Sequence, residues 1–256
     1  MIGVSRRCAV LVLLLTLLAA LLPAVPAAAP LAHREILPNG IVLLVAERPA
    51  VPIVAVRVYT RAGAVLDPPD KPGLANLTGS VLTRGTAKRT GPELDAAIEF
   101  VGGGLEAGAG RDGFTVSLSV LRKDLDLGLD LLQEVLLTPA FPEAEVKRKI
   151  GEIQAAIKRS EENPEAVAAR ALSPLVYGAH PYGRPSEGTI ESVGKLTRDA
   201  VVAFHRERVR PDGAVVAVVG AITVDEARQA IVRRLGGWKA PATPAPPPPQ
   251  GFPPSA

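Results

Sequence analysis

Residues 214–219 form an almost wholly apolar run, Ala-Val-Val-Ala-Val-Val, which constrains the fold more than any other segment. A strand at a solvated surface alternates apolar and polar side chains, whereas a run of small and β-branched residues is typical of a strand buried at the centre of a sheet. The chain is therefore expected to build a sheet around this run. Further strands are predicted at residues 34–37, 41–47, 53–61, 105–109 and 114–120. Asn39-Gly40 joins the first two as a hairpin, with both residues supplying the positive φ angles of a tight turn.

Helices are predicted between and after these strands. Thr90 with Glu93 and Thr223 with Glu226 have the spacing of a capping box, in which each side chain satisfies a free backbone N–H at the start of a helix. Other helices are predicted at residues 73–82, 124–137 and 142–161, and after Asn163-Pro164. Strands and helices do not alternate regularly, so the sequence predicts an α+β fold with helices packed on one face of a largely antiparallel sheet. A doubly wound parallel sheet is the alternative.

The two ends of the chain differ from its middle. Arg6 and Arg7 precede an apolar run at residues 9–22, and small residues follow, which is the layout of a secretory signal peptide at residues 1–29. An uncleaved membrane anchor is the alternative, but the apolar run is shorter than the ~20 residues that a spanning helix needs. We therefore expect an exported protein, periplasmic or extracellular, with no stable membrane anchor after cleavage. Residues 34–239 are expected to form one domain, and the proline-rich residues 240–256 an extended linker.

The charge balance excludes one class of partner. The formal net charge of the chain is +3, and removal of residues 1–29 takes away two arginines and no acidic residue, which lowers it to +1. The remaining sequence has no cluster of lysine and arginine with interleaved aromatic residues. Nucleic-acid binding is therefore not expected.

Residues 73–86, Gly-Leu-Ala-Asn-Leu-Thr-Gly-Ser-Val-Leu-Thr-Arg-Gly-Thr, have the frame of a zinc-peptidase helix without its chemical groups. In the inverted motif H-x-x-E-H, two histidines four residues apart bind zinc from one helix face, and the glutamate is the general base. Asn76, Gly79 and Ser80 occupy these positions. A neutral amide, a missing side chain and a protonated hydroxyl cannot supply the roughly three ligands that catalytic zinc needs. The sequence therefore predicts no catalytic residue and no metal site here.

The residues around this motif resemble the insulinase, pitrilysin and mitochondrial processing peptidase family of zinc metallopeptidases. The resemblance extends over residues 34–239 and is carried by Gly73, Leu74, Ala75, Leu82, Gly85, Thr86, residues 136–141, residues 180–184, Gly188, Thr189 and residues 210–220. It implies a degenerate member of the family, limited to the first domain. The family's third zinc ligand falls on Glu152, the one ligand that is retained. A solvated helical glutamate that pairs with Arg148 and Lys149 is the alternative reading of this residue.

The resemblance also implies a function. Active members of the family bind zinc and work as paired halves around a peptide, and in several pairs one half is degenerate. We therefore expect an exported, non-catalytic homologue that serves as scaffold or peptide-binding subunit for a zinc-bearing partner. An extended peptide would add to the strand at residues 105–109, through Leu105, Glu106 and Ala107. An ordinary paired strand without a ligand is the alternative.

Two other functions stay open at this point. One is a metallopeptidase with an unconventional zinc site, built from His180, His205 and Glu152. No two of the three histidines, which include His33, have helical i, i+3 or i+4 spacing, so loop packing for His180 and a helix surface for His205 are the alternative. The other is a truncated gene fragment that lacks its second domain and has no independent role, which would leave an interdomain face exposed.

Overall fold

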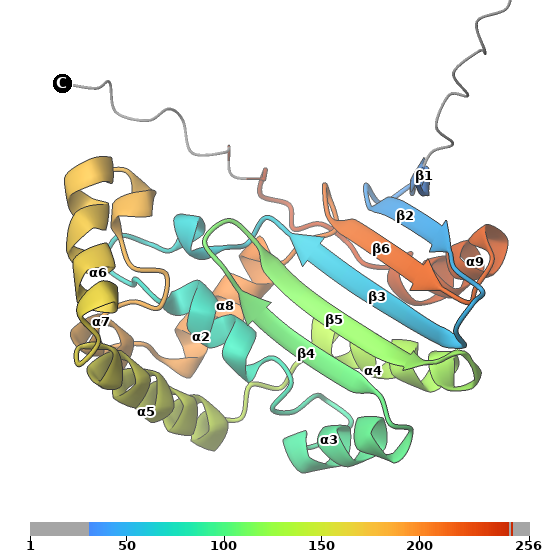
Figure 1. Ribbon diagram of the computed structural model, residues 1–256, viewed down its shortest axis with the longest axis horizontal. Helices are drawn as coiled ribbons and strands as arrows, with labels where there is room; N and C mark the ends of the chain where they lie inside the picture. Colours follow the sequence, from blue (N-terminus) through green and yellow to red (C-terminus); the bar gives the residue numbers. More distant parts are fainter. Residues whose placement is uncertain (1–30, 246, 248–256) are drawn as a thin grey trace, which may run out of the picture. The chain divides into compact units, whose positions relative to one another are not determined.

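A six-stranded sheet lies at the centre of the protein, with the strand order β1-β2-β6-β3-β5-β4 (Figure 1). The computed structural model describes residues 31–245 and 247. The strands are β1 (His33–Ile36), β2 (Val42–Glu47), β3 (Ile53–Thr60), β4 (Gly104–Ala109), β5 (Phe114–Leu121) and β6 (Val215–Gly220). The β2–β6 pair is parallel, and the other four neighbouring pairs are antiparallel. The prediction of a largely antiparallel sheet is confirmed.

The predicted hairpin between β1 and β2 is present, but its turn differs in one detail. Gly40 has a φ of +88°, whereas Asn39 has no positive φ. The Asn39 side chain instead donates hydrogen bonds to the carbonyl oxygens of Leu235, at 2.8 Å, and Trp238, at 3.3 Å. Asn39 therefore ties the turn to the end of the last helix.

Three helices begin directly after the predicted capping residues Thr90, Asn163 and Thr223. The helices are α2 (Leu74–Val81), α3 (Gly91–Phe100), α4 (Leu125–Leu137), α5 (Glu143–Ser160), α6 (Pro164–Tyr177), α7 (Ile190–Gly194), α8 (Arg198–Arg208) and α9 (Val224–Leu235), with short 3-10 turns η1 (Ala64–Leu66), η2 (Arg122–Asp124) and η3 (Pro181–Gly183). The Glu93 carboxylate accepts from the Thr90 amide at 2.8 Å, and the Glu226 carboxylate from the Thr223 amide at 3.1 Å. Both capping boxes are therefore confirmed.

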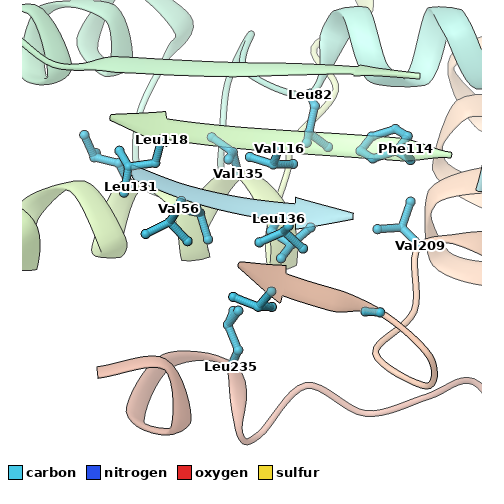
Figure 2. Packing of buried hydrophobic residues seen from close by; sticks show 14 of the residues in the cluster. Val56, Leu82, Phe114, Val116, Leu118, Leu131, Val135, Leu136, Val209 and Leu235 are labelled. Carbon is cyan, nitrogen blue, oxygen red and sulfur yellow. The ribbon is translucent and has the colours of Figure 1, made fainter. Parts of the chain in front are cut away.

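The two faces of the sheet differ in burial. Side chains on one face, among them Val56 and Leu118, are buried under α4 and α9, and Figure 2 shows them packed with Leu131 and Leu235. The opposite face presents smaller and more polar side chains to solvent, including Ala55, Arg57, Ser117, Ser119 and Ala217. Helices therefore cover one face, as predicted.

The apolar run at residues 214–219 is buried on one face of the sheet, whereas its composition predicts burial on both faces. β6 lies inside the sheet, between β2 and β3, so its predicted central position is confirmed. Val216 and Val218 are buried, but Val219 lies on the open face with 42% of its surface exposed. Small and β-branched residues fit a strand whether their side chains face the core or solvent, so their pattern does not identify the face that helices cover.

Helix α2 lies beyond the β4 edge of the sheet, between β4 and α5 (Figure 1), and contacts β4, α5 and α8. The described residues from Ala32 onward belong to one compact unit. The expected signal peptide at residues 1–29 and most of the expected linker after residue 240 lie outside the described residues. Across residues 31–245 and 247, no helix combines the length and the apolar content that crossing a membrane requires.

Candidate functional site

Asp67 fixes the start of α2. Its two carboxylate oxygens accept hydrogen bonds from the amides of Gly73 and Ala75, both at 2.8 Å, and so satisfy N–H groups that the first turn of a helix leaves free. Gly73 has a φ of +93°, a conformation that favours glycine. Burial raises the pKa of Asp67 to about 6, although these hydrogen bonds and the nearby Arg184 oppose the shift. The motif helix therefore has a defined position against the sheet.

The three motif positions point in two directions from α2. Asn76 and Ser80, one turn apart, are partly exposed and face α5. Gly79 is buried against the end of β4, where an added Cβ would lie 2.6 Å from the amide nitrogen of Ala109 and 2.7 Å from the carbonyl carbon of Gly108. Because real Cβ atoms do not approach backbone atoms this closely, α2 and β4 leave no room for a side chain at the position where the motif has its glutamate.

Glu152 lies on α5 with both carboxylate oxygens engaged by cations. Oε1 pairs with the Arg148 guanidinium, and Oε2 accepts from the Lys149 ammonium at 2.6 Å. The hydrogen bond from Lys149, with the charges of Lys149 and Arg148, holds the pKa of Glu152 below its ordinary value. These are the two ion-pair partners that the helical spacing predicts.

Asn76, Ser80 and Glu152 line one pocket of about 540 Å³ between α2 and α5, which we call the α2–α5 pocket. Its other lining residues are Lys149, Ile153, Ala156, Ile157, Arg159, Ser160, Arg170 and Glu187. The structure thus brings together the predicted motif positions that have side chains and the retained glutamate. Sequence reasoning missed Arg159, Arg170 and Glu187 as members of this pocket, because the contact between α2, α5 and α6 is set by tertiary packing.

The residues at these positions do not fit a zinc ion. The donors are one amide, one hydroxyl and one carboxylate that two cations already neutralise, whereas zinc is bound by imidazole, thiolate and free carboxylate groups. Within the part of the chain that the structure describes, no group of three or more histidine, cysteine, aspartate or glutamate residues is placed to hold a metal.

His205 and His180 have separate packing roles. The Nε2 atom of His205 lies 3.0 Å from the carbonyl oxygen of Leu136, and its ring packs edge-on against Phe141. His205 is partly exposed and packs against Leu136 and Phe141, so it lies at the edge of the helix surface, and this desolvation lowers its pKa to about 4. The Nδ1 atom of His180 accepts from the amide of Tyr182 at 3.2 Å, consistent with loop packing.

Strand β4 forms an open edge of the sheet. Gly110 and Gly113 are hydrogen-bonded across the β4–β5 turn. Because paired residues alternate in an antiparallel ladder, the backbone groups of Leu105 and Ala107 point away from β5, and those of Glu106 point toward it. The Leu105 and Ala107 amides have no backbone partner outside the sheet among the described residues. Of the three predicted peptide-binding residues, two therefore offer free edge groups, and Glu106 contributes a side chain on the open face.

Comparisons with known proteins agree with this architecture. The insulinase family, peptidase family M16, matches residues 42–190, and the peptidase M16 inactive domain matches residues 195–256. A crystal structure of a peptidase M16 inactive domain from Pseudomonas fluorescens is 26% identical, with a TM-score of 0.80 over 86% of this chain and 53% of that one. The structure of a protease from Helicobacter pylori, 20% identical with a TM-score of 0.79 over 87% of this chain and 54% of that one, shares the fold.

Curated relatives are similar over most of this chain. A protein named as an uncharacterized zinc protease of Mycobacterium leprae is 32% identical over 195 residues, 75% of this chain and 43% of the relative. Another of the same description, from Mycobacterium tuberculosis, is 31% identical over 205 residues, 79% of this chain and 46% of the relative. The chain spans less than half the length of these relatives. The chain belongs to the insulinase family of peptidases, peptidase family M16.

Proposed function

We propose that this chain is an exported, non-catalytic member of the insulinase family that binds an extended peptide and acts with a zinc-bearing homologue. The observation that carries the proposal is the contact between α2 and β4. At that contact, Gly79 leaves no space for a general base, and the neighbouring edge strand has free backbone groups.

Loss of catalysis is supported by the chemistry of the motif positions. Asn76 and Ser80 are weak ligands, and the Glu152 carboxylate is held by Lys149 and Arg148. A metal ion would have to displace two cations in order to reach one remaining carboxylate. The names of the relatives, which call them zinc proteases, favour the alternative of a metallopeptidase, and the experiment below separates the two.

Peptide binding is supported by the position of β4 at the end of the sheet. An extended peptide that pairs with Leu105 and Ala107 would gain main-chain hydrogen bonds without any catalytic group. Gly108 and Ala109, at the end of the strand, pack against Gly79 of α2, so the peptide would pair with β4 at Leu105 and Ala107.

Co-expression with a zinc-bearing M16 homologue tests this function. The chain alone, the homologue alone and the mixture are compared by light scattering after gel filtration and by cleavage of an internally quenched, unfolded peptide. We expect a stable complex, faster cleavage by the complex than by the homologue alone, and no chelator-sensitive cleavage by the chain alone.

Two results would overturn the proposal. Chelator-sensitive cleavage by the chain alone would identify an enzyme with an unconventional site. A monomer that binds neither the homologue nor peptide would favour a gene fragment without an independent role.

A further inference from the structure

The α2–α5 pocket carries polar groups that nothing in the fold uses. The structure gives the side-chain amide of Asn76 and the hydroxyl of Ser80 no hydrogen-bond partner among the described residues, and both groups line the pocket from α2. Both residues are partly exposed, so water satisfies them in the free protein. An amide N–H and a hydroxyl placed one helical turn apart can both donate to a single acceptor group.

The charges of the pocket favour an anion. Its two carboxylates are already paired, Glu152 with Lys149 and Arg148, and Glu187 with Arg170 at 3.3 Å. Arg159, an exposed residue of α5, also lines the pocket, and it forms no ion pair within the described part of the chain. Three cations therefore face two carboxylates among the lining residues. A cation that enters meets net repulsion, whereas an anion meets an unpaired guanidinium.

The pocket lies next to the edge that we propose for peptide docking. Helix α2 contacts α5 on the side of Asn76 and Ser80, and it contacts β4 through Gly79, which packs against Gly108 and Ala109. Figure 1 shows α2 between β4 and α5. A chain laid along β4 therefore passes α2, the helix that carries Asn76 and Ser80.

We infer that the α2–α5 pocket binds a carboxylate of the docked peptide, with Arg159 as the charged group and Asn76 and Ser80 as neutral hydrogen-bond donors. This inference rests on the proposed peptide-binding function and specifies its ligand: an extended peptide that carries either a free C-terminus or an acidic side chain where it passes α2. The position that holds zinc ligands in the H-x-x-E-H motif thus selects an anionic group in this chain.

The pocket itself is tested with a small carboxylate in the full chain. N-acetylglycine and its uncharged amide are titrated into the ¹⁵N-labelled protein, and the side-chain NH₂ signals of Asn76 report binding. We expect saturable shifts with the carboxylate and none with the amide. Arg159→Gln should lower the affinity for N-acetylglycine about three- to fivefold, which is the effect of losing one exposed ion pair. Arg233→Gln removes another exposed arginine, on α9, that forms no ion pair with the residues that the structure describes, and it should have no effect.

The source of the carboxylate is tested with four labelled peptides. They combine a free or amidated C-terminus with a glutamate or a glutamine side chain, and binding is followed by fluorescence anisotropy. We expect tighter binding for one carboxylate source, and loss of that preference in Arg159→Gln and in Asn76→Ala with Ser80→Ala.

The two arms separate this inference from the proposed function. Binding of N-acetylglycine without binding of any peptide would support the pocket and contradict peptide docking on β4. Equal binding of all four peptides, or equal effects of Arg159→Gln and Arg233→Gln, would overturn the carboxylate pocket and leave peptide docking in place. Absence of binding in both arms would overturn both.

Discussion

Gly79 and Ala109 lie so close that a methyl group on Gly79 would be 2.6 Å from the Ala109 amide nitrogen. One residue belongs to the motif helix α2 and the other to the edge strand β4, so this contact sets the distance between the two elements. Because of this contact, a side chain at position 79, such as the glutamate of the motif, could be admitted only if α2 and β4 moved apart.

The first prediction concerns this contact. Gly79→Ala should destabilise the protein by about 1–3 kcal/mol, because the backbone of β4 has to move to admit a methyl group. Gly151→Ala is the matched control, since Gly151 is also helical but has no atom near its added Cβ, and it should stabilise by about 0.5–1 kcal/mol. Urea unfolding followed by circular dichroism measures both changes. Equal effects of the two substitutions would contradict the close contact.

The second prediction concerns the open edge of the sheet. Ala107→Pro removes an N–H that points away from β5, and an edge strand tolerates proline at such a position. We expect peptide affinity to fall about fivefold, as the peptide loses one main-chain hydrogen bond worth about 1 kcal/mol. Ala107→Ser keeps the N–H and should bind as the wild type does. Anisotropy titrations measure the affinities, and unchanged binding by a folded Ala107→Pro protein would place the peptide elsewhere.

The third prediction concerns acid stability. Burial holds the pKa of His205 at about 4 in the folded state, below its ordinary value of 6.5, so the unfolded state binds more protons between these values. The stabilising contribution is complete above pH 6.5 and is lost as the pH falls toward 4, by roughly 3 kcal/mol in total. Asp67 acts in the opposite sense, because burial raises its pKa to about 6.

A variant isolates the histidine from the other titrating groups. His205→Gln keeps a donor for the carbonyl of Leu136 but does not titrate. Urea unfolding at about pH 7 and about pH 5 should show a smaller loss of stability in His205→Gln than in the wild type. Identical losses would mean that His205 does not titrate as a buried group.

The fourth prediction concerns zinc ligands introduced at the motif positions of α2. Asn76→His combined with Ser80→His places two imidazoles one turn apart on the face of α2 that shares a pocket with Glu152. We expect this variant to bind zinc more tightly than the wild type in competition with a chromophoric chelator. It should not cleave peptide, since Gly79 supplies no general base. Wild-type zinc affinity in the variant would contradict the proposed orientation of the two positions.

Much of the fold follows from local sequence signals. The capping boxes at Thr90 and Thr223 predict where helices begin, because their hydrogen bonds join residues three apart. The motif frame predicts helix α2, and the resemblance assigns Glu152 to the same site. Asn76 and Ser80, the two motif positions of α2 that have side chains, line one pocket with Glu152.

What could not be predicted depends on contacts between distant residues. The apolar run of β6 fits a strand buried on one face and a strand buried on both faces. The exposure of the face that carries Val219 therefore could not be predicted from the sequence. His205 looks like a helix-surface residue in its local sequence and is partly buried because Phe141 and Leu136 pack against it. The approach of Gly79 to β4 had a signal in the small residues Gly108 and Ala109, but its distance required the packed structure.

The zinc content of the purified wild-type chain tests the central claim most directly. The protein is prepared without a histidine tag, saturated with zinc, passed through gel filtration and analysed by inductively coupled plasma mass spectrometry. The account predicts far less than one zinc ion per chain, and no change on Glu152→Gln. One zinc ion per chain that survives gel filtration and is lost in Glu152→Gln would contradict it.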